Sequence, residues 1–206
     1  MILFTHGLYL LHGLVFVVEK AFPFWFVAQG DVFRHRQAMR MIKRKKGCLA
    51  SIEAMAKRIK KGEYITSINP VVDLYNSVSL STLITCGGED LDRIKGDMVL
   101  GFANGNEAFI PLGSSENSPP RDGELIYHDD DGAVVRSWLW READRTKITN
   151  ASNHILLYME LINEHRAAEF AAAADRLYHL IIDELGGSGV MDIIRKDHPE
   201  CALCPM

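Results

Sequence analysis

Two turn sequences in the middle of the chain, each set between apolar runs, restrict the possible folds more than any other feature. Asn104-Gly105 separates residues 98–103 from residues 107–112, and this dipeptide accepts the positive φ angles that tight hairpin turns require. The acidic turn at residues 129–132 ends in glycine and precedes a further apolar run. Each turn predicts an antiparallel hairpin, so we expect a sheet in the middle of the chain.

Helix signals lie on both sides of this expected sheet. Ser51 is expected to cap a helix that ends at Gly62, and Asn69-Pro70 opens a second helix or a strand-to-helix turn. The alanine-rich residues 167–185 predict a long helix, whereas the apolar residues 155–159 are typical of a buried strand. Strands gathered in the middle with helices toward both ends indicate the α+β class.

Charge is distributed unevenly along the chain. Its 23 Lys and Arg against 27 Asp and Glu give a formal net charge of -4, which argues against indiscriminate binding to nucleic acid. Between residues 34 and 61, however, a single acidic residue accompanies a series of basic ones: Arg34, Arg36, Arg40, Lys43, Arg44, Lys45, Lys46, Lys57, Arg58, Lys60 and Lys61. This segment is either a phosphate-binding footprint or the solvated basic face of a helix.

The cysteines suit a reducing compartment. A chain of 206 residues buries enough core as one domain to need no disulfides, so its four cysteines favour a cytoplasmic location. His198, Cys201 and Cys204 offer three zinc ligands near the C-terminus, but a structural zinc site requires four. We therefore expect neither a metal nor another cofactor.

Residues 1–18 are strongly apolar but match no targeting signal well. The segment contains His6 and His12, lacks a positively charged beginning and has no small-residue cleavage pattern after it. Its length is marginal for a membrane span, so we predict buried strands or a core helix, with a membrane anchor as the less favoured alternative.

Residues 137–149, SWLWREADRTKIT, place two of the three tryptophans beside five charged side chains. Tryptophan supplies a stacking surface, and Arg and Lys bind phosphate or carboxylate, which would suit a cleft for the end of a nucleotide chain. The alternative is a strand end followed by a solvated turn, and the pattern alone favours that alternative.

Two stretches, residues 69–79 (NPVVDLYNSVS) and 138–149 (WLWREADRTKIT), resemble the B-three/B-four domain family, the free-standing relatives of the phenylalanyl-tRNA synthetase beta-subunit editing domain. Residues 87–97 (GGEDLDRIKGD) and 111–113 (PLG) fit the same family. The resemblance extends over about residues 42–162. It implies a compact α+β fold with a central antiparallel or mixed sheet and flanking helices.

The same resemblance implies a trans-acting deacylase that hydrolyses the ester between a wrong amino acid and tRNA. We expect an apolar N-terminal segment at residues 1–33, an editing-domain-like module at residues 34–185 and a C-terminal tail at residues 186–206. The protein would be a cytoplasmic monomer that binds mischarged tRNA but neither DNA nor a membrane.

Candidate site residues follow from the resemblance, although parts of the synthetase pocket are replaced. Asn76 is retained from a Thr-Asn pair, and Tyr75 replaces the threonine. The predicted catalytic residues are Asn76, Asp144 and Glu160. Those expected to bind the amino acid are Tyr75, Gly87, Gly88, Glu89, Asp90, Trp140, Arg141 and Thr146. Those expected to contact tRNA are Lys43, Arg44, Lys45, Lys46, Lys60, Lys61, Arg145 and Lys147.

Structural roles remain open for the three catalytic candidates. Asn76 could form a turn or cap a helix, Asp144 could form a salt bridge to Arg141 or Arg145, and Glu160 could reach solvent from the end of its strand. An activated ester needs little more than a positioned water and groups that stabilise charge on the carbonyl.

The substrate expectation rests on the replaced positions. The segment at residues 87–90 has no equivalent of the synthetase's pocket histidine and brings acidic groups in its place. Acidic groups favour a polar or positively charged amino acid, and an arginine-like analogue such as canavanine is the concrete candidate. The alternative function is a tRNA-binding or protein-interaction module that kept the fold and lost the chemistry.

Overall fold

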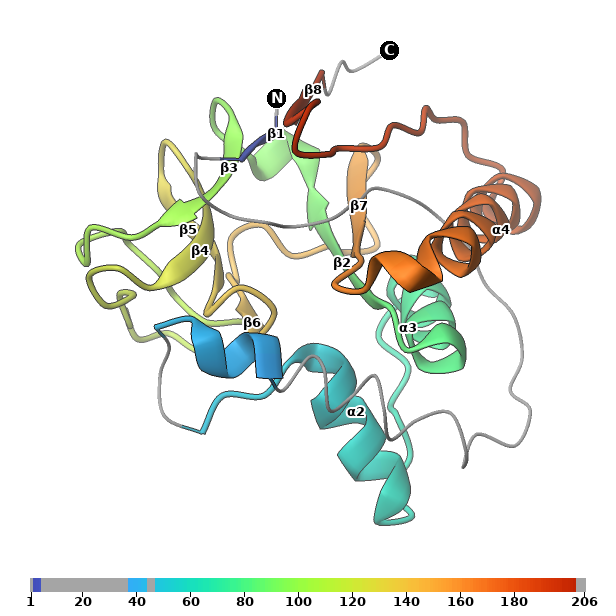
Figure 1. Ribbon diagram of the computed structural model, residues 1–206, viewed down its shortest axis with the longest axis horizontal. Coiled ribbons are helices and arrows are strands. Elements are labelled where there is room, and N and C mark those ends of the chain that lie inside the picture. The colour runs from blue at the N-terminus through green and yellow to red at the C-terminus, as the bar shows by residue number, and fades with distance from the viewer. Residues whose placement is uncertain (1, 5–36, 44–46, 203–206) are drawn as a thin grey trace.

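The computed structural model describes residues 2–4, 37–43 and 47–202, which form two sheets and three long helices (Figure 1). The larger sheet has the strand order β6-β5-β4-β3-β1-β8, and its neighbours pair antiparallel except for the parallel pair β1 and β3. Its strands are β1 (Ile2–Phe4), β3 (Met98–Phe102), β4 (Leu125–Asp129), β5 (Gly132–Arg136), β6 (Arg141–Glu142) and β8 (Glu200–Cys201). The predicted α+β class with a mixed sheet is confirmed.

A two-stranded sheet, β2 (Thr85–Asp90) and β7 (Ile155–Glu160), lies between the larger sheet and helices α3 (Pro70–Thr82) and α4 (Ala167–Leu185) (Figure 1). Side chains alternate between the faces of a strand. Leu157 and Met159 accordingly pack into the core shared with α3 and α4, whereas Tyr158 packs into the core of the larger sheet. The small sheet thus separates two cores.

Helices α3 and α4 form where the sequence predicted them. The Asn69 side chain accepts a hydrogen bond from Val72 N at 3.0 Å, and the following proline occupies the first turn. The buried residues of α4 recur at helical spacing, and the helix ends at Gly186, whose φ of 68° is left-handed. The capping residues and the helical spacing of apolar residues therefore both agree with the observed helices α3 and α4.

Helix α2 (Ser51–Lys60) starts one residue earlier than a serine cap would require. Ala50 occupies the N-cap position without a side-chain hydrogen bond, so the expectation that Ser51 caps the helix is wrong. The Ser51 N–H donates instead to Leu139 O at 2.9 Å. A tertiary contact therefore satisfies a helix N-terminal donor that a cap would otherwise satisfy.

The hairpin at residues 129–132 is confirmed as the connection between β4 and β5. Buried Asp129 accepts hydrogen bonds from the backbone N–H groups of Lys95, Asp131 and Gly132. Arg145 forms an ion pair with the same carboxylate. The acidic turn is therefore held to two other parts of the chain.

The hairpin expected around Asn104-Gly105 is wrong. Residues 104 and 105 do turn, with both N–H groups donating to the Glu107 carboxylate, but the chain does not pair back on β3. The ladder instead joins β3 to β4 and continues to Ala103, whose N–H donates to Glu124 O at 2.8 Å. Pro111 cannot donate to a ladder, and it makes only an isolated bridge to Ala143.

The apolar N-terminal segment lies almost wholly outside the described residues, apart from β1. No helix in the described part of the chain is long and apolar enough to cross a membrane.

Candidate functional site

A cavity of about 460 Å³ lies between the small sheet, the N-terminal half of α2 and the turn from β5 to β6. This volume is within the range of small-molecule sites, roughly 300–1,000 Å³. Its lining residues are Gly47, Leu49, Ser51, Ala54, Met55, Ile68, Thr85, Cys86, Gly87, Leu112, Val135, Trp138, Leu139, Trp140, Arg141, Glu142, Tyr158 and Glu160. The walls are mostly apolar, and two carboxyl groups are placed among them.

The floor of the cavity is the face of the small sheet that points away from α3 and α4. Cross-strand partners share a face, and here Gly87 is opposite Tyr158 while Thr85 is opposite Glu160. Charged side chains are rarely buried without partners. A buried sheet face that carries polar groups therefore indicates a binding site.

Gly87 makes room for the ring of Tyr158. A Cβ atom at this position would lie 2.5 Å from Tyr158 Cζ, closer than real contacts allow. The ring crosses β2 at the glycine, and its hydroxyl donates to Glu89 Oε1 at 3.3 Å. The glycine thereby fixes where an aromatic wall of the cavity lies.

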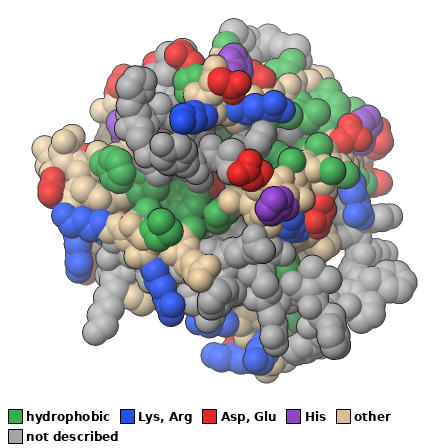
Figure 2. Space-filling view, in the orientation of Figure 1, with side chains coloured by type: hydrophobic (Ala, Val, Ile, Leu, Met, Phe, Trp, Pro, Cys, Tyr) green, Lys and Arg blue, Asp and Glu red, His purple; other side chains and the backbone are tan. Residues whose placement is uncertain are grey.

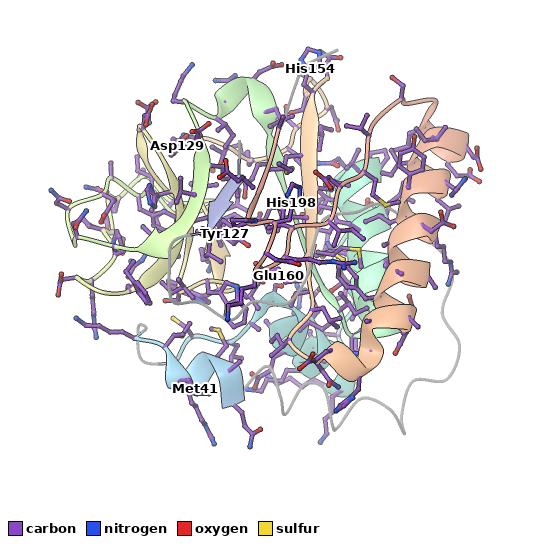
Figure 3. All side chains as sticks on the ribbon, turned by 45° about the horizontal axis from the view of Figure 1, so that its top comes forward. Met41, Tyr127, Asp129, His154, Glu160 and His198 are labelled. Carbon is purple, nitrogen blue, oxygen red and sulfur yellow. The ribbon has the colours of Figure 1, made fainter. Side chains whose placement is uncertain are left out.

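Glu160 is buried, and Tyr127 OH donates a hydrogen bond to its Oε1 (Figure 3). Burial raises the pKa of Glu160 to about 7, although Tyr127 and the Trp138 indole favour the ionised form. Neither Glu160 Oε2 nor Trp138 Nε1 completes a hydrogen bond within the described residues. The indole nitrogen and the carboxylate thus influence each other at the cavity wall without meeting the geometry of a hydrogen bond.

The turn that delivers Trp138 is strained and firmly held. Ser137 and Trp138 have φ angles of 47° and 62°, in the left-handed region that residues other than glycine rarely adopt. Glu124 stabilises this turn because it accepts hydrogen bonds from Ser137 N at 3.0 Å and Ser137 Oγ at 2.8 Å. Arg136 adds a buried ion pair with Glu124 at 2.8 Å.

The groups around Glu124 favour its ionised form. Burial opposes the charged form, but hydrogen bonds from Arg136, the Arg121 N–H and Ser137 outweigh it and lower the pKa of Glu124. The turn is thus organised around a carboxylate that stays ionised at neutral pH.

Two further carboxyl groups lie at or behind the cavity wall. Burial raises the pKa of Glu142 to about 7, while neighbouring Arg141 favours the ionised form. Glu89 lies behind Tyr158, and burial followed by repulsion from Glu142 raises its pKa well above the ordinary value. Of the two, Glu142 lines the cavity, and at neutral pH it is poised to exchange a proton or to receive a cation.

The structure separates the three predicted catalytic residues. Glu160 lines the cavity and does not reach solvent, whereas Asn76 lies half-buried on α3 outside the lining. Asp144 also lies outside the lining and pairs with Lys147 at 2.8 Å, rather than with either arginine that the sequence offered.

The predicted amino-acid-binding residues fall into two groups. Gly87, Trp140 and Arg141 line the cavity. The others lie outside its lining: Tyr75 and Gly88 pack in the core around β2, Glu89 and Thr146 are buried behind the wall, and Asp90 caps the short η1 helix (Leu91–Arg93).

The predicted tRNA-binding residues that the structure describes lie on several different elements. Lys43 pairs with Asp122, Lys147 with Asp144 and Arg145 with Asp129, whereas Lys60 and Lys61 lie at the end of α2. The remaining three, Arg44, Lys45 and Lys46, lie outside the described residues.

Trp138, Glu142 and Tyr158 were not selected from the sequence. Tyr158 precedes Glu160 by two residues, so strand periodicity alone would have placed both on one face. The sequence placed Trp138 within the stretch at residues 137–149 but gave no signal for its direction, because that direction depends on the left-handed turn. Among the described residues, no cluster of three His, Cys, Asp or Glu side chains could hold a metal ion.

Comparison with known proteins gives one family match. The family model described as the B3/4 domain matches residues 34–182. No curated protein matches the chain. Among solved structures, an N-terminal fragment of the phenylalanyl-tRNA synthetase beta-subunit from Pyrococcus horikoshii is similar at 10% sequence identity, with a TM-score of 0.39. The match covers 81% of this chain and 45% of that fragment, so the chain spans less than half of the fragment's length.

Proposed function

Because this chain belongs to the B3/4 domain family, we propose that it is a trans-acting hydrolase that removes a wrongly attached amino acid from tRNA. The cavity beside β2 and β7 would receive the aminoacyl end of the tRNA. Its mostly apolar walls would surround the amino acid, and its carboxyl groups would supply the chemistry.

One observation carries this proposal: Glu160, a buried carboxyl group whose pKa is about 7, lines the cavity beside the Trp138 indole, which favours its ionised form. A water in the cavity would donate a hydrogen bond to this carboxylate. Such a water is positioned for proton transfer to a base whose pKa is about 7.

The hydrolysis follows from this arrangement. Glu160 takes a proton from the water as the water oxygen attacks the ester carbonyl carbon. The bond from that carbon to the ribose oxygen then breaks, and the ribose oxygen receives the proton back from Glu160. Free amino acid and uncharged tRNA leave, and the carboxylate is restored.

Glu142 favours a substrate with a positively charged side chain. The apolar side chains of Leu49, Met55 and Leu139 would pack along an alkyl stem, while Glu142 would pair with a cationic head group. An arginine-like amino acid such as canavanine, attached to an arginine tRNA, combines both features. Tyrosine would leave the Glu142 carboxyl unpaired.

The test is release of amino acid from a panel of mischarged tRNAs. The parent should hydrolyse basic or polar aminoacyl-tRNAs faster than tyrosyl-tRNA, with unchanged rates in chelator. Glu160→Gln should lower kcat by about 10²- to 10⁴-fold, the usual contribution of a general base. Glu142→Gln should retain activity and lose the preference for the basic side chain.

Glu164→Gln is the matched control, because Glu164 is an exposed glutamate outside the cavity lining. It should behave as the parent. Binding of tRNA without release of any amino acid would refute the hydrolase and leave a non-catalytic tRNA-binding module of the same fold. Unchanged turnover in Glu160→Gln would remove Glu160 from the mechanism.

A further inference from the structure

Three large apolar side chains are exposed at the end of α2 and in the connection from α2 to α3. Tyr64 has 91% of its surface exposed, Ile68 63% and Ile59 40%. Exposed aromatic rings are used to stack unpaired bases, since every base presents a flat face. With Arg58, Lys60 and Lys61, we call these six residues the α2–α3 strip.

The segment that carries Tyr64 is held in place by side chains on both helices. Arg58 Nη2 donates to Tyr64 O at 3.1 Å, which fixes the backbone at the aromatic residue. Asp73 accepts from Ile68 N at 2.8 Å and from Ser67 Oγ at 2.5 Å. The Tyr64 ring is therefore presented to solvent from an anchored backbone, which lowers the entropic cost of binding.

Positive charge accompanies the exposed ring. One acidic residue, Glu63, is shared between Arg58 at 3.4 Å and Lys61 at 3.8 Å. Lys60 makes no ion pair with any residue that the structure describes. Basic side chains also gather at the bottom of Figure 2, near the end of α2 in Figure 1. A flat ring with uncompensated cations is complementary to bases joined by phosphates.

The α2–α3 strip continues into the cavity. Ile68 belongs to the strip and also lines the cavity, and the N-terminal half of α2 contributes Ser51, Ala54 and Met55 to the cavity wall. A strand of nucleotides lying along the strip would therefore end at the cavity that contains Glu160.

We propose that the α2–α3 strip binds the single-stranded acceptor end of tRNA, with one base stacked on Tyr64 and adjacent phosphates on Lys60 and Lys61. The choice of tRNA as the nucleic acid rests on the proposed function. The stacking site itself is a property of the strip and does not require hydrolysis.

Binding of uncharged tRNA tests the strip independently of the chemistry. Titrations would compare intact tRNA with tRNA lacking its unpaired 3′ nucleotides. Tyr64→Ala should weaken binding of intact tRNA by about 5- to 150-fold, the usual range for one stacked base, and leave binding of truncated tRNA unchanged. Tyr64→Phe should bind as the parent, because the ring is kept.

The lysines are tested by salt dependence. Neutralising Lys60 and Lys61 together should reduce the slope of log affinity against log salt by about 0.7 for each lysine that contacts a phosphate of a single strand. An unchanged slope would contradict the assignment of phosphates to these lysines.

Phe102→Ala is the matched control, because Phe102 is another exposed aromatic residue but lies on β3 outside the α2–α3 strip. It should bind RNA as the parent does. Tyr64→Ala should also retain the parental rate on a small aminoacyl-adenosine ester, which would occupy the cavity, because Tyr64 is not part of the cavity lining. If Tyr64→Ala bound intact tRNA as tightly as the parent, the proposal would be overturned, whatever the outcome of the hydrolysis assays. A protein partner would then be the alternative for this surface.

Discussion

Glu160 is held in a state suited to proton transfer near neutral pH. Water would keep a glutamate ionised, but burial against the small sheet raises the pKa of Glu160 to about 7. The Tyr127 hydroxyl counters that shift because it donates to the ionised form. The side chain is thus a stronger base than an exposed carboxylate and is still available in its ionised form.

The raised pKa of Glu160 predicts how the rate of hydrolysis depends on pH. The base must be ionised, so kcat/KM should rise with pH and reach half of its plateau near pH 7. Tyr127→Phe should move this midpoint to higher pH, because it removes a hydrogen bond that favours ionisation. Glu142→Gln should keep the midpoint. The measurement is kcat/KM across pH 5–9, and a rate independent of pH over that range would exclude Glu160 as the base.

The packing of Tyr158 requires a glycine at position 87, because a Cβ atom there would overlap the tyrosine ring. In Gly87→Ala the new methyl group would overlap the Tyr158 ring, so the ring must move and its hydrogen bond to Glu89 must break. Overpacking of this kind costs about 1–3 kcal/mol of unfolding free energy.

Denaturant unfolding and tRNA deacylation would both detect the Gly87→Ala change. We expect lower stability together with a loss of activity, since Tyr158 lines the cavity. Gly189→Ala is the control, because nothing lies within 4 Å of its added Cβ. Parental stability of Gly87→Ala would mean that the ring is not confined by the glycine.

At the scale of elements, the connection from β5 to β6 positions the cavity wall. Glu124, immediately before β4, accepts hydrogen bonds from both Arg136 and Ser137, and these bonds hold the left-handed turn. The sequence predicted a strand end in this region but not its direction. Ser137 and Trp138 carry no local signal for positive φ, because contacts with a strand earlier in the chain impose it.

Glu124→Ala should therefore destabilise the protein and displace Trp138. It leaves the Arg136 guanidinium buried without its partner, which typically costs about 3–5 kcal/mol. Asp122→Asn breaks the exposed pair with Lys43 and should cost less than about 1 kcal/mol. Denaturant unfolding measures both costs, and Trp fluorescence reports the displacement. Equal effects of the two variants would contradict a structural role for Glu124.

Local sequence signals predicted the elements whose ends are fixed by adjacent residues. Helices α3 and α4 and the β4–β5 hairpin carry their own caps and turns. Strand β2 was not predicted, because Gly87-Gly88-Glu89-Asp90 has weak strand propensity and pairs only through contact with β7. The cavity likewise combines α2, β2, β7 and the β5–β6 turn, so the sequence indicated Glu160 but could not assemble its surroundings.

At the scale of the whole molecule, the packing of the small sheet against the larger one brings carboxyl groups into one region, where Glu89 and Glu160 are buried and Glu142 is half-buried. Burial is the largest influence on Glu89, Glu142 and Glu160, and all three have raised pKa values. Ionising these groups inside the folded protein is unfavourable compared with ionising them in the unfolded chain. The burial that raises these pKa values therefore lowers the unfolding free energy at pH values where the carboxyl groups are ionised.

The unfolding free energy should consequently fall as pH rises. Each of these groups favours the folded state below its unfolded pKa of 4.5, and that contribution is lost as pH passes through the folded pKa, about 7 for Glu142 and Glu160. Glu124 has a lowered pKa and acts in the opposite direction, so its contribution is lost as pH falls below 4.5. Stability should be greatest near pH 5 and decline by a few kcal/mol, in order of magnitude, toward pH 8.

Denaturant titrations at a series of pH values would measure this decline. The glutamine in Glu160→Gln cannot ionise, so at pH 8 this variant should be more stable than the parent although its kcat is reduced. Its stability should also change less with pH. Glu164→Gln changes an exposed group and should follow the parental profile. Parental stability that stays level or rises between pH 5 and pH 8 would contradict the inferred cost, and Glu160 would then have to be ionised without penalty in the folded protein.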